Sequence, residues 1–179
     1  ELVKSSILLQ KAVYDNIQFN LHLHDLDSKI FGDSAMLSQA LTNLLKNSAE
    51  SINTSKKKTI SNGKKIGIID IFTDLNNGFL EIKIFDTGVG LDNNITNFFE
   101  PYVTTKQNGT GLGLAIVRKI IEQHDGSLNI YNSAKTLHRT YNKGAIAVIK
   151  LPLILNKNKL HSDISLKADF QIKEKIKTL

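Results

Sequence analysis

Three glycines at alternate positions, Gly109, Gly111 and Gly113, are followed by Leu114 and then by the apolar residues 115–117. Glycines at the start of a helix leave backbone N–H groups accessible, and the positive end of the helix dipole attracts an anion there. The pattern is therefore typical of a phosphate-binding loop that leads into a helix. A tight helix entry without a ligand is the alternative, although these glycines would then cost helix stability for no packing gain.

The spacing of these glycines excludes the common phosphate-binding loops. A Walker loop needs Lys-Ser or Lys-Thr after its last glycine, and neither pair follows Gly113. A dinucleotide-binding loop needs G-x-G-x-x-G, but Leu114 and Ile116 stand three residues after Gly111 and Gly113. The glycine loop of protein kinases fails on the same spacing.

Hydrophobic periodicity divides the chain into helices and strands. Helical spacing covers residues 1–15, 35–52 and 111–124, and strand patterns cover residues 17–23, 66–72, 79–85, 127–131 and 145–151. In the first helix we expect Leu2, Ile7, Leu8 and Val13 on one side, and in the second an apolar stripe of Leu37, Leu41, Leu44, Leu45 and Ile52.

A hairpin signal, Asn76-Asn77-Gly78, joins the second and third strand patterns. Because this hairpin interrupts a strict strand–helix–strand rhythm, we expect a mixed or mostly antiparallel sheet. Helices should cover one face, which gives an α/β fold of the two-layer sandwich type.

Composition narrows the function classes. The 179 residues include no cysteine, which excludes a disulfide scaffold, a thiolate zinc site, an iron–sulfur cluster and a cysteine nucleophile. The net charge of +6 suggests a nucleic-acid-binding module, but Arg118 and Arg139 are the only arginines and tryptophan is absent. A solvated lysine-rich surface explains the charge better, and we expect no nucleic-acid partner.

A second glycine motif, residues 86–90 (DTGVG), follows the strand pattern that ends at Phe85. Asp86 at the end of a strand, with Gly88 and Gly90 opening the backbone beside it, suits an acceptor for an exocyclic amine such as that of adenine. A simple turn in which Asp86 binds its own backbone explains the motif equally well.

Asn43 and Asn47 lie four residues apart on the second predicted helix and share one face, with Glu50 at the next turn. Amide oxygens are suitable ligands for Mg²⁺, which is commonly bound together with substrate phosphates. Taken alone, two ordinary asparagines of a helix surface are the better explanation.

Together, the segments NLLKNSAES, DTGVG and FFEPYVTTKQNGTGLGLAIV make the chain resemble the ATP-binding catalytic domain of sensor histidine kinases. DNA gyrases, heat-shock chaperones and mismatch-repair ATPases share that fold, the Bergerat-type ATP-binding fold. Four motifs of this family occur in order between residues 17 and 153: the N box with Asn43 and Asn47, the G1 box at 86–90, the F box at 98–102 and the G2 box at 109–113. The amino-acid sequence of these motifs is most similar to that of sensor kinases of the nitrogen-regulation type.

The resemblance implies ATP and Mg²⁺ as cofactors and assigns a role to each matched residue. Asn47 would reach the metal with Asn43 beside it, Asp86 would accept from the adenine amine, and Lys106 would contact phosphate oxygens at the end of a mobile lid over residues 91–108. The implied nucleotide-binding set is Asn43, Asn47, Asp86, Gly88, Gly90, Thr105, Lys106, Gly109, Thr110, Gly111, Leu112 and Gly113.

Asn43 separates kinase from hydrolase. Hydrolytic members of the fold carry at this position a glutamate that activates water, and an amide cannot take a proton. We therefore expect phosphoryl transfer to a side chain, with an ATPase or a protein serine kinase of the same fold as the alternative. Glu50 follows Asn47 and is a poor substitute for that glutamate.

None of the five histidines suits a phosphoacceptor, which in this family lies on an upstream dimerising helix. We expect residues 1–15 to be a linker or the remnant of that helical domain, 16–154 the ATP-binding domain and 155–179 a polar basic tail. The implied partners are the upstream domain and a response regulator. The implied setting is the cytoplasmic part of a membrane-anchored bacterial sensor kinase, homodimeric at full length although this fragment would be monomeric.

Overall fold

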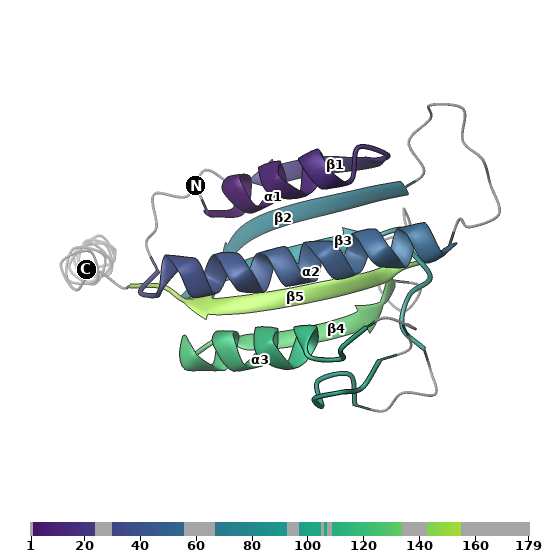
Figure 1. Cartoon of the computed structure of the whole chain (residues 1–179). Helices are drawn as coiled ribbons and strands as arrows, with labels where there is room; N and C mark the ends of the chain where they lie inside the picture. Colours follow the sequence, from purple (N-terminus) through teal and green to yellow (C-terminus); the bar gives the residue numbers. More distant parts are fainter. Residues whose placement is uncertain are drawn as a thin grey trace, which may run out of the picture.

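A computed structural model describes residues 2–23, 30–55, 67–92, 97–104, 106, 109–133 and 143–154. Three helices lie on one face of a five-stranded sheet, so the predicted two-layer α/β sandwich is confirmed (Figure 1). The elements are α1 (Leu2–Val13), β1 (Ile17–Leu23), α2 (Ser34–Ser55), β2 (Gly67–Asn76), β3 (Phe79–Asp86), α3 (Gly113–Gln123), β4 (Ser127–Asn132) and β5 (Ala145–Pro152). No helix among these is long and apolar enough to cross a membrane.

The strand order is β1-β2-β3-β5-β4, with β1 parallel to β2 and the other pairs antiparallel. The sheet is therefore mixed, as the central hairpin predicts. That hairpin turns at Asn77 and Gly78, whose φ angles of 50° and 82° suit the tight turns that favour Asn-Gly. Since β3 lies in the middle of the sheet, its last residue, Asp86, lies between two neighbouring strands.

The core lies between the sheet and α2, which crosses the middle of the covered face (Figure 1). All five residues of the predicted stripe on α2 are buried, as are the inward residues of the central strands, among them Ile69, Ile71, Ile82 and Ile84. Each such side chain contributes about 1.5–3 kcal/mol through burial. This packing fixes which face of α2 remains for polar residues.

Asp33 caps the start of α2, because its Oδ1 accepts from the backbone N–H groups of Ala35 at 2.8 Å and Met36 at 3.1 Å. At the end of α3, His124 holds the two helices together: its Nε2 accepts from the Asp33 N–H at 2.9 Å, while its Nδ1 is 2.7 Å from the Ile120 carbonyl oxygen.

The expected apolar side of α1 is wrong in part. Ile7 is buried, but Leu8 and Val13 are 71% and 69% exposed. The face that packs against α2 also carries the polar side chains of Ser6 and Gln10, both buried, so apolar residues alone do not mark it. Residues 2–13 pack against the folded unit, and the boundary near residue 15 remains a prediction.

Candidate functional site

Asp86 is the buried acidic residue of the site. It is 4% exposed, and its Oδ1 accepts from the backbone N–H groups of Gly88 at 2.9 Å and Ala145 at 3.3 Å, while the Ser48 hydroxyl also hydrogen-bonds to the carboxyl. Burial raises the pKa of Asp86 to about 6, although these donors pull the pKa down. Among the described residues, no cation pairs with it.

The glycines around Asp86 are required by close packing. A side chain at Gly88 would overlap Ser51 of α2, and Gly144, at φ +117°, lies against the Asp86 carbonyl. Gly90 has a φ of +81°, a conformation that favours glycine. The bond from Gly88 to Asp86 is the one a simple turn would make, but a simple turn does not require an aspartate buried among three donors.

Asn47 lies on α2, one residue before Ser48, and faces the start of α3. The position of a Cβ on Gly113 would be 3.8 Å from the Asn47 Nδ2, which places the first residue of α3 beside this asparagine. Asn43 lies one turn earlier on the same helix and is half-buried like Asn47. The structure therefore brings Asp86, Asn47 and the glycine loop to one end of the covered face.

Two glycines of the loop differ in what they require. Gly111, at φ +69°, lies so near the backbone of Tyr102 that an added Cβ would be 2.5 Å from its carbonyl carbon. A tight entry explains this glycine without a ligand. Gly113 has open space around it apart from Asn47, so packing does not explain the missing side chain. Its position at the N-terminus of α3 favours an anion site.

Of the remaining predicted residues in the glycine loop and the lid, some make backbone contacts and others lie outside the described residues. The Gly109 N–H donates to the Lys106 carbonyl at 3.1 Å, and the Thr110 hydroxyl accepts weakly from the Leu112 N–H at 3.4 Å. Thr105 lies outside the described residues, as do residues 93–96, 107 and 108 of the expected lid. The F box packs on α3, where the Arg118 guanidinium lies 5.4 Å from the ring centre of Phe99.

Lys106 reaches back to α2. Its ammonium donates to the Asn47 Oδ1 at 3.0 Å and forms an ion pair with Glu50, whose carboxylate also lies 3.9 Å from Lys46. Burial, followed by the negative charge of Glu50, raises the pKa of Tyr14 at the end of α1. Sequence reasoning set Glu50 aside and missed Ser48; the spacing of both from Asn47 on a helix was the available signal.

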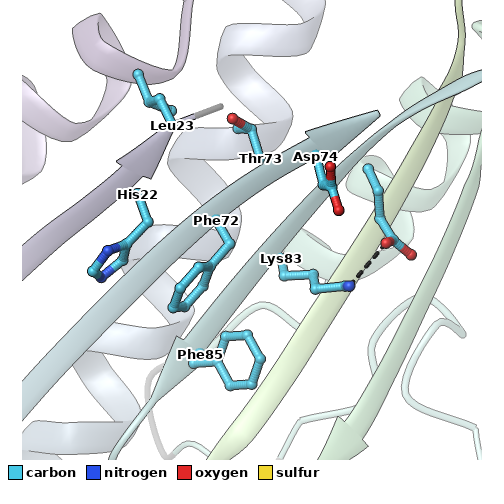
Figure 2. A pocket seen from close by; sticks show the side chains of 8 residues that line it. His22, Leu23, Phe72, Thr73, Asp74, Lys83 and Phe85 are labelled. Atoms are coloured by element: carbon cyan, nitrogen blue, oxygen red, sulfur yellow. Dashed lines mark ion pairs between the residues drawn. The ribbon is translucent and has the colours of Figure 1, made fainter. Parts of the chain in front are cut away.

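The two described histidines make contacts within the fold, and neither lies at the candidate site. His124 joins two helices, and His22 stacks on Phe72 with ring centres 4.3 Å apart, on the sheet face opposite the three described helices, called here the uncovered face. Figure 2 shows His22 in a pocket of that face, with Phe72 between it and Lys83. The Lys83 ammonium forms an ion pair with Glu81. His24, His138 and His161 lie outside the described residues.

Comparison with known proteins identifies the family. Residues 32–155 match the family model "Histidine kinase-, DNA gyrase B-, and HSP90-like ATPase". The chain belongs to this family. It is 36% identical over 149 residues to sporulation kinase B of Bacillus subtilis (83% of this chain, 31% of that protein). It is also 36% identical over 131 residues to nitrogen regulation protein NtrY of Azorhizobium caulinodans (73% of this chain, 16% of that protein).

Solved structures agree with this family. The catalytic domain of histidine kinase ThkA matches with a TM-score of 0.67 and 25% identity, covering 84% of this chain and 90% of that one. Mycobacterial sensor histidine kinase MprB shares the fold, with a TM-score of 0.67 over 85% of this chain and 92% of that one, at 24% identity. The chain is an ATP-binding catalytic domain of the sensor-kinase type, and it spans less than a third of the curated relatives described above.

Proposed function

We propose that this domain binds Mg·ATP at the end of the covered face and supplies the γ-phosphoryl group to a histidine of an upstream helical domain. The observation that carries the proposal is Asp86, a buried carboxylate with neutral donors and no described cation. Such a group stabilises a bound donor strongly, because water does not compete for it.

Asp86 would accept a hydrogen bond from the adenine amine. Gly88 and Gly90 would line the base, because glycine lets their backbone pack closely on Ser51 of α2 and on Asn132 and so fixes it beside Asp86. The hydrogen bond from Leu91 to the Asn132 Oδ1, at 2.6 Å, holds the chain that follows Gly90 against β4. Base recognition would thus rest on backbone positions fixed by the sheet.

Asn47, Lys106 and the first residues of α3 would hold the triphosphate and its metal. The Asn47 Oδ1 already accepts a hydrogen bond from a cation, the Lys106 ammonium, at 3.0 Å. An amide oxygen in this position also fits a hard metal cation. Gly109, Thr110, Gly111, Leu112 and Gly113 would present backbone to the phosphates, with Thr105 beside them. Bound magnesium supplies charge neutralisation and orientation of the phosphates.

Asn43 favours a kinase over a hydrolase. It lies one turn before Asn47, where a general base would have to be, and its amide cannot accept a proton from water. Glu50 lies on the other side of Asn47 and is engaged by Lys106. Transfer would therefore depend on positioning an acceptor side chain in line with the phosphate.

The acceptor would be a histidine of the upstream dimerisation domain, and a response regulator would receive the phosphoryl group next. This proposal extends to the whole protein the names of its relatives, which include nitrogen-regulation and sporulation kinases. It also places this domain on the cytoplasmic side of a membrane-anchored, dimeric sensor kinase.

Calorimetry with a non-hydrolysable ATP analogue tests the binding step. We expect saturable binding that requires Mg²⁺, weaker binding by Asn47→Ala and almost none by Asp86→Ala. Asn129→Ala, which alters an exposed residue of the uncovered face, is the matched control for Asn47. Folded Asp86→Ala protein that binds like the parent would refute the adenine assignment.

Amide exchange in the lid should also slow when nucleotide is added.

Phosphoryl transfer is tested by adding a separate acceptor-histidine domain from a similar kinase. We expect phosphate release near background from the isolated domain and phosphorylation of the acceptor in trans. Multiple-turnover hydrolysis by the isolated domain would instead favour the ATPase alternative.

A further inference from the structure

The Lys106 ammonium lies between two oxygen atoms of α2. It donates to the Asn47 Oδ1 at 3.0 Å and forms an ion pair with the Glu50 Oε2. Asn47 and Glu50 are three residues apart on the helix, so their side chains lie on the same surface one turn apart. A single cation is therefore shared by a neutral amide oxygen and a carboxylate oxygen.

Two oxygens that converge on one ammonium nitrogen can also converge on a metal ion. Mg²⁺ prefers oxygen ligands and is usually held by one or two carboxylates together with substrate phosphates and water. The proposed metal ligand, Asn47, contributes an amide oxygen and no charge. Glu50 supplies the missing carboxylate at the same position.

We infer that Glu50 is a second protein ligand of the nucleotide-bound magnesium, at a position that the Lys106 ammonium takes in this structure. This inference rests on the proposed function and adds a residue to its metal site. Magnesium and Lys106 are then alternative cations for one pair of oxygens, and Lys106 leaves that pair when the metal arrives.

Exposure and charge permit this exchange. The side chains of Glu50 and Lys106 are 32% and 41% exposed, so both can change rotamer at the surface of the site. When Lys106 leaves, the N-terminus of α3 lies nearby, because Gly113 is next to Asn47. Its ammonium can then pair with phosphate oxygens at that helix end. Lys46 lies 3.9 Å from Glu50 and remains as its second cation.

The decisive measurement is how strongly nucleotide affinity depends on the metal. Calorimetry gives the Kd of a non-hydrolysable ATP analogue with Mg²⁺ and with EDTA, and the ratio of the two isolates the metal contribution. We expect Glu50→Gln to reduce that ratio at least about tenfold, since a lost metal interaction typically costs 10- to 100-fold in affinity. Glu50→Asp should retain part of the ratio.

Glu122→Gln is the matched control, because it makes the same chemical change in an ion pair at the far end of α3. It should leave the ratio unchanged. A Glu50→Gln ratio equal to that of this control overturns the inference.

The Lys106→Met background shows whether Glu50 acts as a metal ligand or only as an anchor for Lys106. If Glu50 binds metal, Glu50→Gln lowers the ratio in this background as it does in the parent. If Glu50 acts only through Lys106, the second substitution has no further effect, and the inference is wrong.

A metal-only arm distinguishes failure of this inference from failure of the proposed function. Mn²⁺ added without nucleotide to Lys106→Met protein should broaden the Asn47 side-chain amide signals in NMR spectra, and Glu50→Gln should remove that broadening. No nucleotide binding by the parent would refute the proposed function, while broadening that depends on Glu50 would still support the shared cation position. Binding of nucleotide without broadening would refute Glu50 as a ligand.

Discussion

Strand β3 carries two buried acidic residues with opposite surroundings. Glu81, on the uncovered face, is 8% exposed and pairs with Lys83 at 2.8 Å and Lys150 at 3.5 Å. Asp86, at the end of the strand on the covered face, is 4% exposed and has only neutral donors among the described residues. Because five positions separate them, the strand pleat points them to opposite sides of the sheet.

The two pKa values record this difference. Burial alone would raise the pKa of Glu81, but the Lys83 and Lys150 ammonium groups outweigh it and hold the pKa below its usual value. Burial prevails at Asp86 and raises its pKa to about 6. Glu81 is compensated by cations within the fold, whereas burial leaves the ionised form of Asp86 under-stabilised, as expected of a ligand-binding group rather than a structural one.

When the two carboxylates are substituted one at a time, we expect the largest difference in nucleotide affinity. Asp86→Asn removes a charge-assisted hydrogen bond to the base, so we expect the Kd of an ATP analogue at pH 8 to rise roughly 10- to 100-fold. Glu81→Gln, the same change on the other face, should leave the Kd within about twofold. Calorimetry measures both, and equal losses would show that the intact strand, rather than the Asp86 charge, governs binding.

The same two substitutions should change the free energy of unfolding in opposite directions. The pKa of Asp86 is higher in the folded state, so the folded protein loses stability as pH rises from about 4 to 6. Asp86→Asn should therefore stabilise the ligand-free domain by about 1–3 kcal/mol at pH 8. Urea unfolding measures this gain, and a loss of stability would contradict the assigned pKa.

For Glu81 the sign is reversed. Its pKa is lower in the folded state, so its contribution is present above the unfolded pKa and is lost as pH falls through the folded pKa. Glu81→Gln should cost about 1 kcal/mol at pH 8, because the two lysines that lose their partner are themselves partly exposed. The cost should shrink in urea unfolding at pH 3.

A smaller effect is expected in the pH dependence of binding. The ionised Asp86 is the better acceptor, so nucleotide affinity should be nearly full above about pH 7 and fall by up to about tenfold by pH 5. Asp86→Asn should remove this dependence, and Glu81→Gln should retain it. A parent protein whose affinity is flat from pH 7 to 5 would show that Asp86 does not titrate in this range.

The smallest effect concerns α2, which faces Asp86 and not Glu81. Asn43→Glu restores a carboxylate one turn before Asn47, and we expect ATP hydrolysis by the isolated domain to rise only a few-fold above background. A phosphate-release assay measures this, with Asn129→Glu on the uncovered face as the control for added charge. A large increase in ATP hydrolysis would indicate that the parent domain lacks only a general base to be an ATPase.

Local patterns in the sequence were sufficient for the elements and for the positions of the candidate motifs. The hairpin at residues 76–78 and the apolar stripe of α2 were both predicted, because each depends on neighbours within a few residues. The family was identifiable from four short motifs in order, and the model match over residues 32–155 confirms it.

The tertiary structure decided which side chains meet. Lys106 and Glu50 are 56 residues apart, and Asp86 and Ala145 are 59 apart, so only the packing of α2 and the strand order β3-β5 bring these partners together. The packing face of α1, with buried Ser6 and Gln10, was likewise set by its neighbour α2. The sequence alone determined the helices, strands and motifs, because backbone preference and periodicity are local. The charge balance of the site depends on long-range contacts, which no local pattern encodes.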